Sequence, residues 1–391
     1  MNYILFDGAT RTALLPLTYT RPVAELRIGI LTIREKWELY LGFATTTLTE
    51  EYLDAKFPMV EMEKNIMINA SFLPTTNLVT LIQDLKENQA IFYGEDVLAF
   101  FTTEDQDEVN FDLYEHIDFD EEIIQIKNTW DLFALNNKAI NDDFELLTDG
   151  RVSQPIPEGV QYINKDQIFI EEGATILFSS LNATNGPIFI GRNSIIMEGC
   201  TVRGPFALCE NSILKMGTKV YGGTTIGPHS KIGGEVTNSV IFGNTNKGHD
   251  GFLGNSVLGE WCNLGADTNN SNLKNNYAEV RIWNYESENF AKTGLQFCGL
   301  IMGDHSKCAI NTMFNTGTVV GVSCNIYGSN FPRNFIPSFS WGGAAGFSTY
   351  QIDKATETAK LVLQRRNLSF EEEDENILSH IFELSKKHRN Y

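Results

Sequence analysis

A six-residue repeat constrains the fold of this 391-residue chain more than any other feature. An aliphatic residue recurs at every sixth position, and the residue four places later is small in most units. The aliphatic positions are Ile190, Ile196, Val202, Leu208, Leu214, Val220, Ile226 and Ile232. An amphipathic helix would repeat every 3.6 residues and a half-buried strand every two, so neither fits. The period predicts a solenoid, whose turns bury their apolar side against neighbouring turns.

The same register returns later in the chain. Its later positions are Phe252, Leu258, Leu264, Met302, Cys308, Phe314, Val320 and Ile326. The interruptions predict two insertions that leave the solenoid, at residues 238–251 and 270–301. Insertions in a solenoid project from one face and commonly build the binding site. The second insertion contains the sequence "IWNY", which we expect to be exposed.

Units with one aliphatic and one small position resemble the hexapeptide-repeat family. That family folds as a left-handed parallel β-helix, a three-sided prism with three hexads per coil. The resemblance implies such a prism over residues 161–336, filled by the aliphatic residues. Three cysteines, Cys200, Cys262 and Cys324, then occupy crowded corners.

The regions on either side differ from the repeat. Residues 1–130 alternate apolar strands with helical stretches, which predicts an α/β domain with some parallel sheet. Residues 131–160 read as a connecting helix and a linker. Residues 337–391 begin with a glycine-rich segment and continue into two helices, the second expected to start at a Ser369 N-cap answered by Glu372.

Composition excludes several classes of function. The formal net charge is -20 and no cationic run occurs, which argues against nucleic acid as a partner. No apolar run reaches the roughly 18 residues of a membrane span, and the start "MNYILFDGAT" lacks a signal-peptide pattern, so we expect a cytoplasmic protein. The six cysteines have no metal-binding spacing, and we interpret the acidic segment 103–115 as solvated surface. No metal ligand is therefore predicted.

An α/β domain, a connecting helix and a hexapeptide β-helix, in that order, resemble the GlmU-type bifunctional enzymes that make UDP-N-acetylglucosamine. The likeness is strongest in "NKGHDGFLGNSVLGEWCNLGADTNNSN". It implies that His249 is the catalytic base and that Ala266 and Asn272 contact acetyl-CoA. The positions it implies for substrate contacts are Asn263, Asn272, Lys247, Phe252 and Tyr221.

The chemistry of acetyl transfer requires such a histidine. The amine of an amino sugar is largely protonated near neutral pH and cannot attack a thioester until a base removes the proton. Imidazole is the side chain whose unperturbed pKa suits this task. Asp250 could orient the ring or be a solvated loop residue, whereas His229 and His305 lie within hexads and are expected at the surface.

Two departures from the family pattern stand out. Tyr221 and Thr237 occupy positions where the family has an arginine and a lysine for the sugar phosphate. Either other cations replace them or the acceptor is a different amino sugar. The candidate replacements are Arg203, Lys219, Lys247 and Lys274. A zinc hydrolyase on the same prism is disfavoured, because the close-spaced histidine pair of that class is absent.

The N-terminal stretch "FDGATRTALLPLTYTRP" resembles the glycine-rich turn of sugar nucleotidyltransferases, without its second glycine. The resemblance implies a nucleotide site at Gly8, Arg11 and Arg21, with Mg²⁺ as cofactor if that domain is active.

Together these features favour an enzyme that acetylates an amino sugar phosphate, glucosamine-1-phosphate, with acetyl-CoA. Uridyl transfer from UTP would then give UDP-N-acetylglucosamine. The family assembles as homotrimers, in which the 270–301 insertion would pack on a neighbouring subunit. The alternative is a non-catalytic subunit that binds a sugar nucleotide and regulates or scaffolds a partner.

Overall fold

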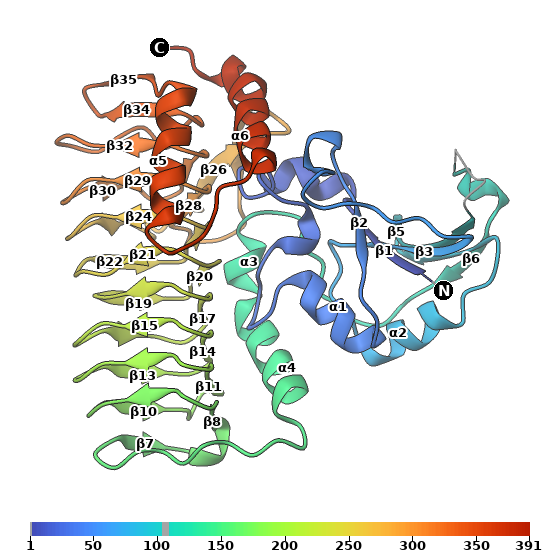
Figure 1. Ribbon diagram of the computed structural model, residues 1–391, viewed down its shortest axis with the longest axis horizontal. Coiled ribbons are helices and arrows are strands. Elements are labelled where there is room, and N and C mark those ends of the chain that lie inside the picture. Colours follow the sequence, from blue (N-terminus) through green and yellow to red (C-terminus); the bar gives the residue numbers. More distant parts are fainter. Residues whose placement is uncertain (1, 104–108) are drawn as a thin grey trace.

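The computed structural model describes residues 2–103 and 109–391, so part of the acidic segment, residues 104–108, lies outside the described residues. An α/β domain stands beside a long prism, with helix α4 between them (Figure 1). Helices α5 and α6 lie against the C-terminal end of the prism. The α-helices are α1 (Ile33–Leu41), α2 (Thr76–Gln83), α3 (Asp131–Ala134), α4 (Asn136–Thr148), α5 (Ile352–Gln364) and α6 (Glu372–Leu384). Short 3₁₀ helices occur at Ala9–Leu14, Val23–Glu25, Glu51–Leu53, Phe111–Leu113, Lys165–Gln167 and Ser385–His388.

The N-terminal domain is built on a six-stranded mixed sheet of order β2-β1-β3-β5-β4-β6. Its strands are β1 (Asn2–Phe6), β2 (Thr46–Leu48), β3 (Lys64–Asn69), β4 (Gln89–Tyr93), β5 (Asp96–Thr103) and β6 (Glu115–Asp118). Strand β1 runs parallel to β2 and β3, whereas β5 is antiparallel to both of its neighbours. The prediction of an α/β domain with some parallel sheet is confirmed.

The prism has three faces of parallel strands. The first face holds β7 (Gln161–Ile163), β10 (Ser180–Asn182), β13 (Thr201–Arg203), β16 (Lys219–Val220), β19 (Glu235–Thr237) and β22 (Phe252–Gly254), and the pair β25 (Asn269–Asn270) and β30 (Met313–Phe314) follows β22. The second face holds β8 (Ile168–Ile170), β11 (Ile188–Ile190), β14 (Phe206–Leu208), β17 (Thr224–Ile226), β20 (Val240–Ile241), β23 (Val257–Leu258), β28 (Leu300–Met302), β31 (Thr318–Val320) and β33 (Phe335–Ile336). The third face holds β9 (Thr175–Ile176), β12 (Ile195–Ile196), β15 (Ile213–Leu214), β18 (Lys231–Ile232), β21 (Asn246–Lys247), β24 (Asn263–Leu264), β29 (Lys307–Cys308), β32 (Asn325–Ile326) and β34 (Ser340–Gly343), with β35 (Gly346–Thr349) antiparallel at its end.

The repeat positions fill the prism, as the sequence predicts. The aliphatic residues from Ile190 to Ile232 are at most 2% exposed and form one continuous core. Small residues take the corners, where the Ser212 hydroxyl donates to the carbonyl of Gly227 (2.8 Å). The left-handed parallel β-helix is confirmed.

Residues 238–251, predicted as an insertion, instead belong to the prism. They supply β20 and β21, which pair in parallel with β17 and β18. The repeat is hidden here because turns shorter than six residues shift its phase: the interior positions after Ile232 are Val236 and Ile241. The same shift makes Leu253 the interior residue, with 1% exposure, and not Phe252.

The chain leaves the prism after β25 and returns at β28. Within that excursion, β26 (Arg281–Asn284) and β27 (Asn289–Lys292) form an antiparallel hairpin. The expectation that "IWNY" is exposed is wrong. Ile282 and Tyr285 are 2% and 5% exposed, and Trp283 stacks on Phe335 at 4.1 Å between ring centres. Tyr285 also meets Tyr19 of the N-terminal domain edge to face, so the hairpin packs within its own chain.

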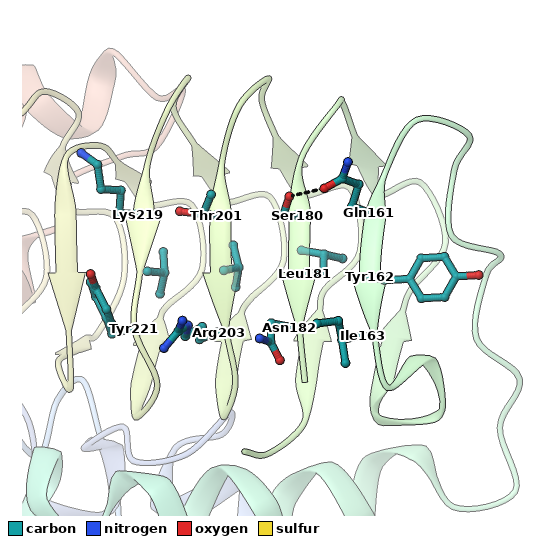
Figure 2. A pocket seen from close by; sticks show the side chains of 12 residues that line it. Gln161, Tyr162, Ile163, Ser180, Leu181, Asn182, Thr201, Arg203, Lys219 and Tyr221 are labelled. Atoms are coloured by element: carbon teal, nitrogen blue, oxygen red, sulfur yellow. Dashed lines mark hydrogen bonds between the residues drawn. The ribbon is translucent and has the colours of Figure 1, made fainter. Parts of the chain in front are cut away.

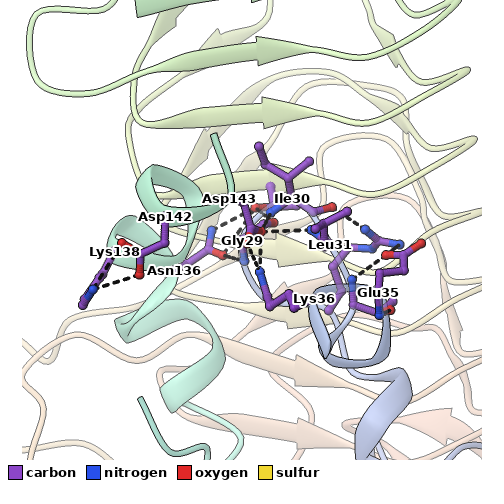
Figure 3. A network of polar contacts seen from close by, with 12 residues as sticks. Gly29, Ile30, Leu31, Glu35, Lys36, Asn136, Lys138, Asp142 and Asp143 are labelled. Carbon is purple, nitrogen blue, oxygen red and sulfur yellow. Dashed lines mark hydrogen bonds and ion pairs between the residues drawn. The ribbon is translucent and has the colours of Figure 1, made fainter. Parts of the chain in front are cut away.

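Helix α4 joins the N-terminal domain to the second face of the prism (Figure 3). Asn136 accepts a hydrogen bond from the Gly29 amide (2.7 Å) and donates to the Gly223 carbonyl (2.9 Å). Buried Asp143 accepts from the Ile30 amide (2.6 Å) and pairs with the Lys36 ammonium. One helix therefore ties the two domains together through satisfied buried polar groups.

Helices α5 and α6 close the fold. Helix α6 begins two residues later than predicted, because Glu371 and Asp374 form the capping box while Ser369 donates to the Glu371 carboxylate. Within residues 2–103 and 109–391, every helix is too short or too polar to cross a bilayer.

Candidate functional site

A groove of about 640 Å³ lies between the third face of the prism and the C-terminal end of α5. We call it the third-face groove. It brings together His249, Asn263 and Ala266, three residues that the sequence assigns to one site. Its lining also includes the cations Lys215, Lys231, Lys307, Arg365 and Arg366.

The floor of the groove follows from the parallel register of the third face. Lys231 is opposite Asn246, Asn246 is opposite Asn263, and Asn263 is opposite Lys307. These side chains share one outer surface, because equivalent positions in a parallel sheet point the same way. His249 is exposed at the corner that follows β21, where the chain turns from the third face to the first. A ligand on the floor can therefore meet the imidazole at the edge.

The wall opposite the floor is fixed by Arg366. Its guanidinium donates to the carbonyl of His229 (2.8 Å) and to the side-chain oxygens of Asn244 (3.2 Å) and Asn246 (3.3 Å). It also lies 5.5 Å from the ring centre of Trp261, a cation–π contact. Arg365, the preceding residue, is exposed at the same helix end.

Lys307 is partly buried in the floor. Its ammonium donates to the carbonyl of His305 (2.8 Å), and burial lowers its pKa to about 8. Among the described lining residues there are five cations and no carboxylate, in a chain of net charge -20. The groove is thus a local cationic site suited to an anionic ligand.

The other predicted substrate contacts lie elsewhere. Lys247 points into the prism and is 1% exposed. Tyr221 lies on the first face with Arg203 and Lys219, in a shallow cavity of about 460 Å³ (Figure 2). Both side chains lie outside the groove because alternate residues of a strand face opposite ways and each coil distributes its strands over three faces.

Phe252 and Asn272 also lie outside the groove lining. Phe252 begins β22 on the first face, and the Asn272 amide donates to Asn255 (2.8 Å). Both converge on Gly254, where a Cβ atom would lie 2.5 Å from the Phe252 ring and 2.7 Å from Asn272 Nδ2. They pack against the prism beside the start of the excursion. Lys274, a candidate replacement cation, donates to the Glu279 carbonyl (2.8 Å) within that excursion.

Two more expectations are corrected at the seam between the domains. Arg21, predicted to bind a nucleotide, is buried and paired with Asp304 and Glu260 (3.4 Å) of the prism. His305, expected at the surface, is half-buried and stacked on Trp261 (6.3 Å, 10° between planes), and burial lowers its pKa to about 3. These residues line a seam cavity of about 400 Å³, which shares Trp261 with the third-face groove.

The glycine-rich turn forms a separate pocket of about 410 Å³ that includes Gly8 and Arg11. Arg11 is 9% exposed, and its guanidinium donates to Asp7 (2.8 Å) and to the Thr18 carbonyl (2.6 Å). The pocket also contains Glu50 and Glu51, so its charge disfavours phosphate.

The described residues of this pocket do not fit a Mg²⁺ ion. Asp7 accepts hydrogen bonds from the Val23 amide (2.7 Å), the Thr49 hydroxyl (2.6 Å) and Arg11. Burial raises its pKa, which disfavours the carboxylate that the ion prefers. Across the described ranges, no three His, Cys, Asp or Glu side chains are grouped to hold a metal.

Sequence reasoning missed the cations of the groove. Lys215 and Lys231 look like ordinary outward positions of hexads. Arg365 and Arg366 end a helix, where the helix dipole favours cations without any ligand. Only the docking of α5 across the third face brings the two pairs together.

Comparison with known proteins agrees with this architecture. Residues 3–152 match the family model described as sugar nucleotidyl transferase. The bifunctional protein GlmU of Methanocaldococcus jannaschii is 31% identical over 136 residues, which cover 35% of this chain and 28% of the relative. GlmU of Synechococcus elongatus is 22% identical over 261 residues, covering 61% of this chain and 53% of the relative. The solved structure of the polySia specific acetyltransferase NeuO is 14% identical, with a TM-score of 0.27. The match covers 53% of this chain and 96% of the NeuO chain.

The chain thus spans about a quarter to a half of the length of these GlmU relatives. The match begins in the N-terminal domain, and the β-helix follows it in the order that the sequence predicts. The chain is therefore GlmU-like, with a domain similar to sugar nucleotidyl transferases followed by a left-handed β-helix of the hexapeptide type.

Proposed function

We propose that the third-face groove transfers an acetyl group from acetyl-CoA to the amine of an amino sugar phosphate, with glucosamine-1-phosphate as the first acceptor to test. One observation carries the proposal: an exposed histidine stands at the edge of a groove lined by five cations. Both proposed substrates are phosphorylated, and lysine and arginine are the side chains that bind phosphates.

His249 acts as the general base in this proposal. The imidazole takes a proton from the amino group, and the freed nitrogen attacks the thioester carbonyl. A C–N bond forms as the C–S bond breaks, the second proton that the nitrogen must lose passes to solvent, and the imidazolium returns the first proton to the departing thiolate of CoA. Asn263 and Ala266 line the same groove and would contact the reacting groups.

Thiol release from acetyl-CoA in the presence of glucosamine-1-phosphate tests the proposal. We expect release by the wild-type protein and at least about 100-fold less by His249→Ala, the lower bound of the range for a general base. His116→Ala is the matched control, because His116 is exposed on the distant strand β6. Release that persists in His249→Ala contradicts the assignment of the base. No wild-type release with any amino sugar phosphate of a panel contradicts the activity.

A second role is proposed for the N-terminal domain: it is a scaffold for the β-helix and does not transfer a nucleotide. The Arg11 guanidinium donates to Asp7 and to the Thr18 carbonyl, and Arg21 is paired with Asp304 of the prism. Calorimetry with UTP tests this role. We expect no binding heat, and uridyl transfer from UTP to N-acetylglucosamine-1-phosphate would contradict it.

A further inference from the structure

Lys247 occupies a position that the rest of its column gives to apolar residues. It lies on β21 of the third face, opposite Ile232. The interior column reads Ile176, Ile196, Leu214, Ile232, Lys247, Leu264, Cys308 and Ile326. The side chain is 1% exposed, so its ammonium is inside the prism.

The ammonium is held only by main-chain oxygens among the described contacts. Nζ donates to the carbonyl of Gly233 (2.9 Å) and to the carbonyl of His249 (2.9 Å). Within residues 2–103 and 109–391, no carboxylate lies within ion-pair distance of it. The other fully buried lysine, Lys36, has Asp143 as its partner (Figure 3).

The corner around Nζ is built to bring the His249 loop close. A Cβ at Gly233 would lie 2.9 Å from the Gly248 carbonyl oxygen and 3.2 Å from the His249 amide nitrogen. A Cβ at Gly234 would lie 2.6 Å from the Gly251 carbonyl oxygen and 2.9 Å from Lys247 Nζ. Residues 248–251 therefore rest directly on residues 233–234, and the lysine fastens the two layers from inside.

This arrangement is unfavourable for stability alone. A buried ammonium without an ion-pair partner loses hydration that two neutral carbonyls replace only in part. An apolar side chain would complete the column, as it does in the coils on either side. Lys247 breaks the apolar pattern of the interior column at the residue that contacts His249, and such a departure points to function.

We infer that Lys247 is a positioning residue for acyl transfer: its ammonium, held inside the prism, fixes the main chain of His249 so that the imidazole faces the groove. The inference rests on the proposed function for the role of His249. The contact to the His249 carbonyl is independent of that proposal.

The test compares Lys247→Met with wild type. Methionine keeps the length and removes the donor. We expect kcat to fall about 100-fold, the scale of a 1 Å misplacement at a reacting group. The KM for acetyl-CoA should stay within about twofold, because the cations of the groove remain. The midpoint of urea unfolding should rise, because the unpaired charge is gone.

Two controls separate this role from general damage. Leu214→Met, in the same column, should change neither kcat nor the unfolding midpoint appreciably. Lys36→Met should lower the midpoint, because it leaves Asp143 buried without its cation. A Lys247→Met protein that is more stable and less active cannot be explained by a merely structural lysine.

Amide hydrogen exchange of residues 246–253 gives a readout that needs no activity. We expect faster exchange in Lys247→Met than in wild type or Leu214→Met, because the loop loses its inner anchor. Unchanged exchange, or an unchanged kcat, overturns the inference. If the wild type transfers no acetyl group but exchange is still faster in Lys247→Met, Lys247 anchors the His249 loop and the proposed function is wrong. The role of Lys247 in acyl transfer then falls with that function.

Discussion

At the scale of single residues, Lys247 inside the prism and Lys307 in the floor of the third-face groove have lowered pKa values. Burial lowers the pKa of Lys247 and of Lys307 to about 8. Asp250, Asp267 and the Cys308 thiol face Lys247 and oppose that shift without cancelling it. A lysine in an unfolded chain titrates near 10.4, so each buried site holds fewer protons than the unfolded state above about pH 8.

This difference predicts a pH-dependent effect of Lys247→Met on stability. Below pH 8 the wild type bears the full penalty of a buried charge, and the penalty shrinks as pH rises from 8 to about 10 because the buried amine becomes neutral. The gain in the free energy of unfolding from Lys247→Met should therefore be about 2 kcal/mol smaller at pH 9.5 than at pH 7. Urea unfolding of both proteins at the two pH values measures it. The buried thiols other than Cys308, which faces Lys247, cancel in the difference between the two proteins. A gain independent of pH would contradict the lowered pKa.

The adjacent arginines at the end of α5 should behave differently. Arg365 is exposed in the groove, whereas Arg366 is engaged with three partners of the prism. We expect Arg365→Ala to raise the KM for acetyl-CoA about 10- to 150-fold, the loss of a hydrogen bond to a charged group, with an unchanged Tm. Arg366→Ala should also lower Tm. Steady-state kinetics and thermal melts of the two variants decide, and equal effects on Tm would contradict the division of roles.

At the scale of elements, the hairpin β26–β27 packs the excursion between β25 and β28 against its own chain. Trp283 stacks on Phe335 and meets Phe290 edge to face, within one chain. We expect Trp283→Ala to lower the free energy of unfolding by about 3 kcal/mol, the cost of removing a packed aromatic ring. Tyr277→Ala, an exposed position of the same excursion, should change it little. Urea unfolding with light scattering measures both effects. If the hairpin instead packed on a second copy, Trp283→Ala would change the molar mass.

The same scale explains what the sequence could predict. The repeat from Ile190 to Ile232 predicts the prism because each coil buries its apolar residues against its immediate neighbours, which is a local property. The resemblance to the GlmU-type enzymes assigns His249, Asn263 and Ala266 to one site, and in the structure they lie on two successive coils. Lys247 was misplaced because a search for aliphatic residues cannot recognise a lysine in an interior position.

The rest of the groove depends on contacts between distant segments. The sequence predicts a helix after the glycine-rich segment, where α5 (Ile352–Gln364) lies, but not that it docks across the third face. Docking is set by the shared core of the hairpin, the second face and the two last helices, and no single segment contains that information. The cations of α5 could therefore not be assigned to a ligand in advance.

At the scale of the whole molecule, one ion pair joins the N-terminal domain to the end of the β-helix that holds the groove. Arg21 reaches Asp304, which also accepts from the Thr20 hydroxyl (2.7 Å) and from the Glu260 amide (2.9 Å). Glu260 precedes Trp261 in the wall of the groove. The pair therefore links the domain interface to the wall of the groove, where Arg366 contacts Trp261.

Arg21→Met tests that link. It leaves Asp304 buried without its cation, and we expect the free energy of unfolding to fall by about 3–5 kcal/mol. The double variant Arg21→Met/Asp304→Asn should recover part of the loss, because a neutral amide no longer carries an uncompensated charge. Since the wall shifts with its support, acetyl transfer should also weaken in Arg21→Met, although Arg21 belongs to the other domain. Urea unfolding and thiol release on the three proteins measure both effects. A double variant no more stable than the single one would mean that the cost arises from lost packing of the arginine stem and not from the stranded carboxylate.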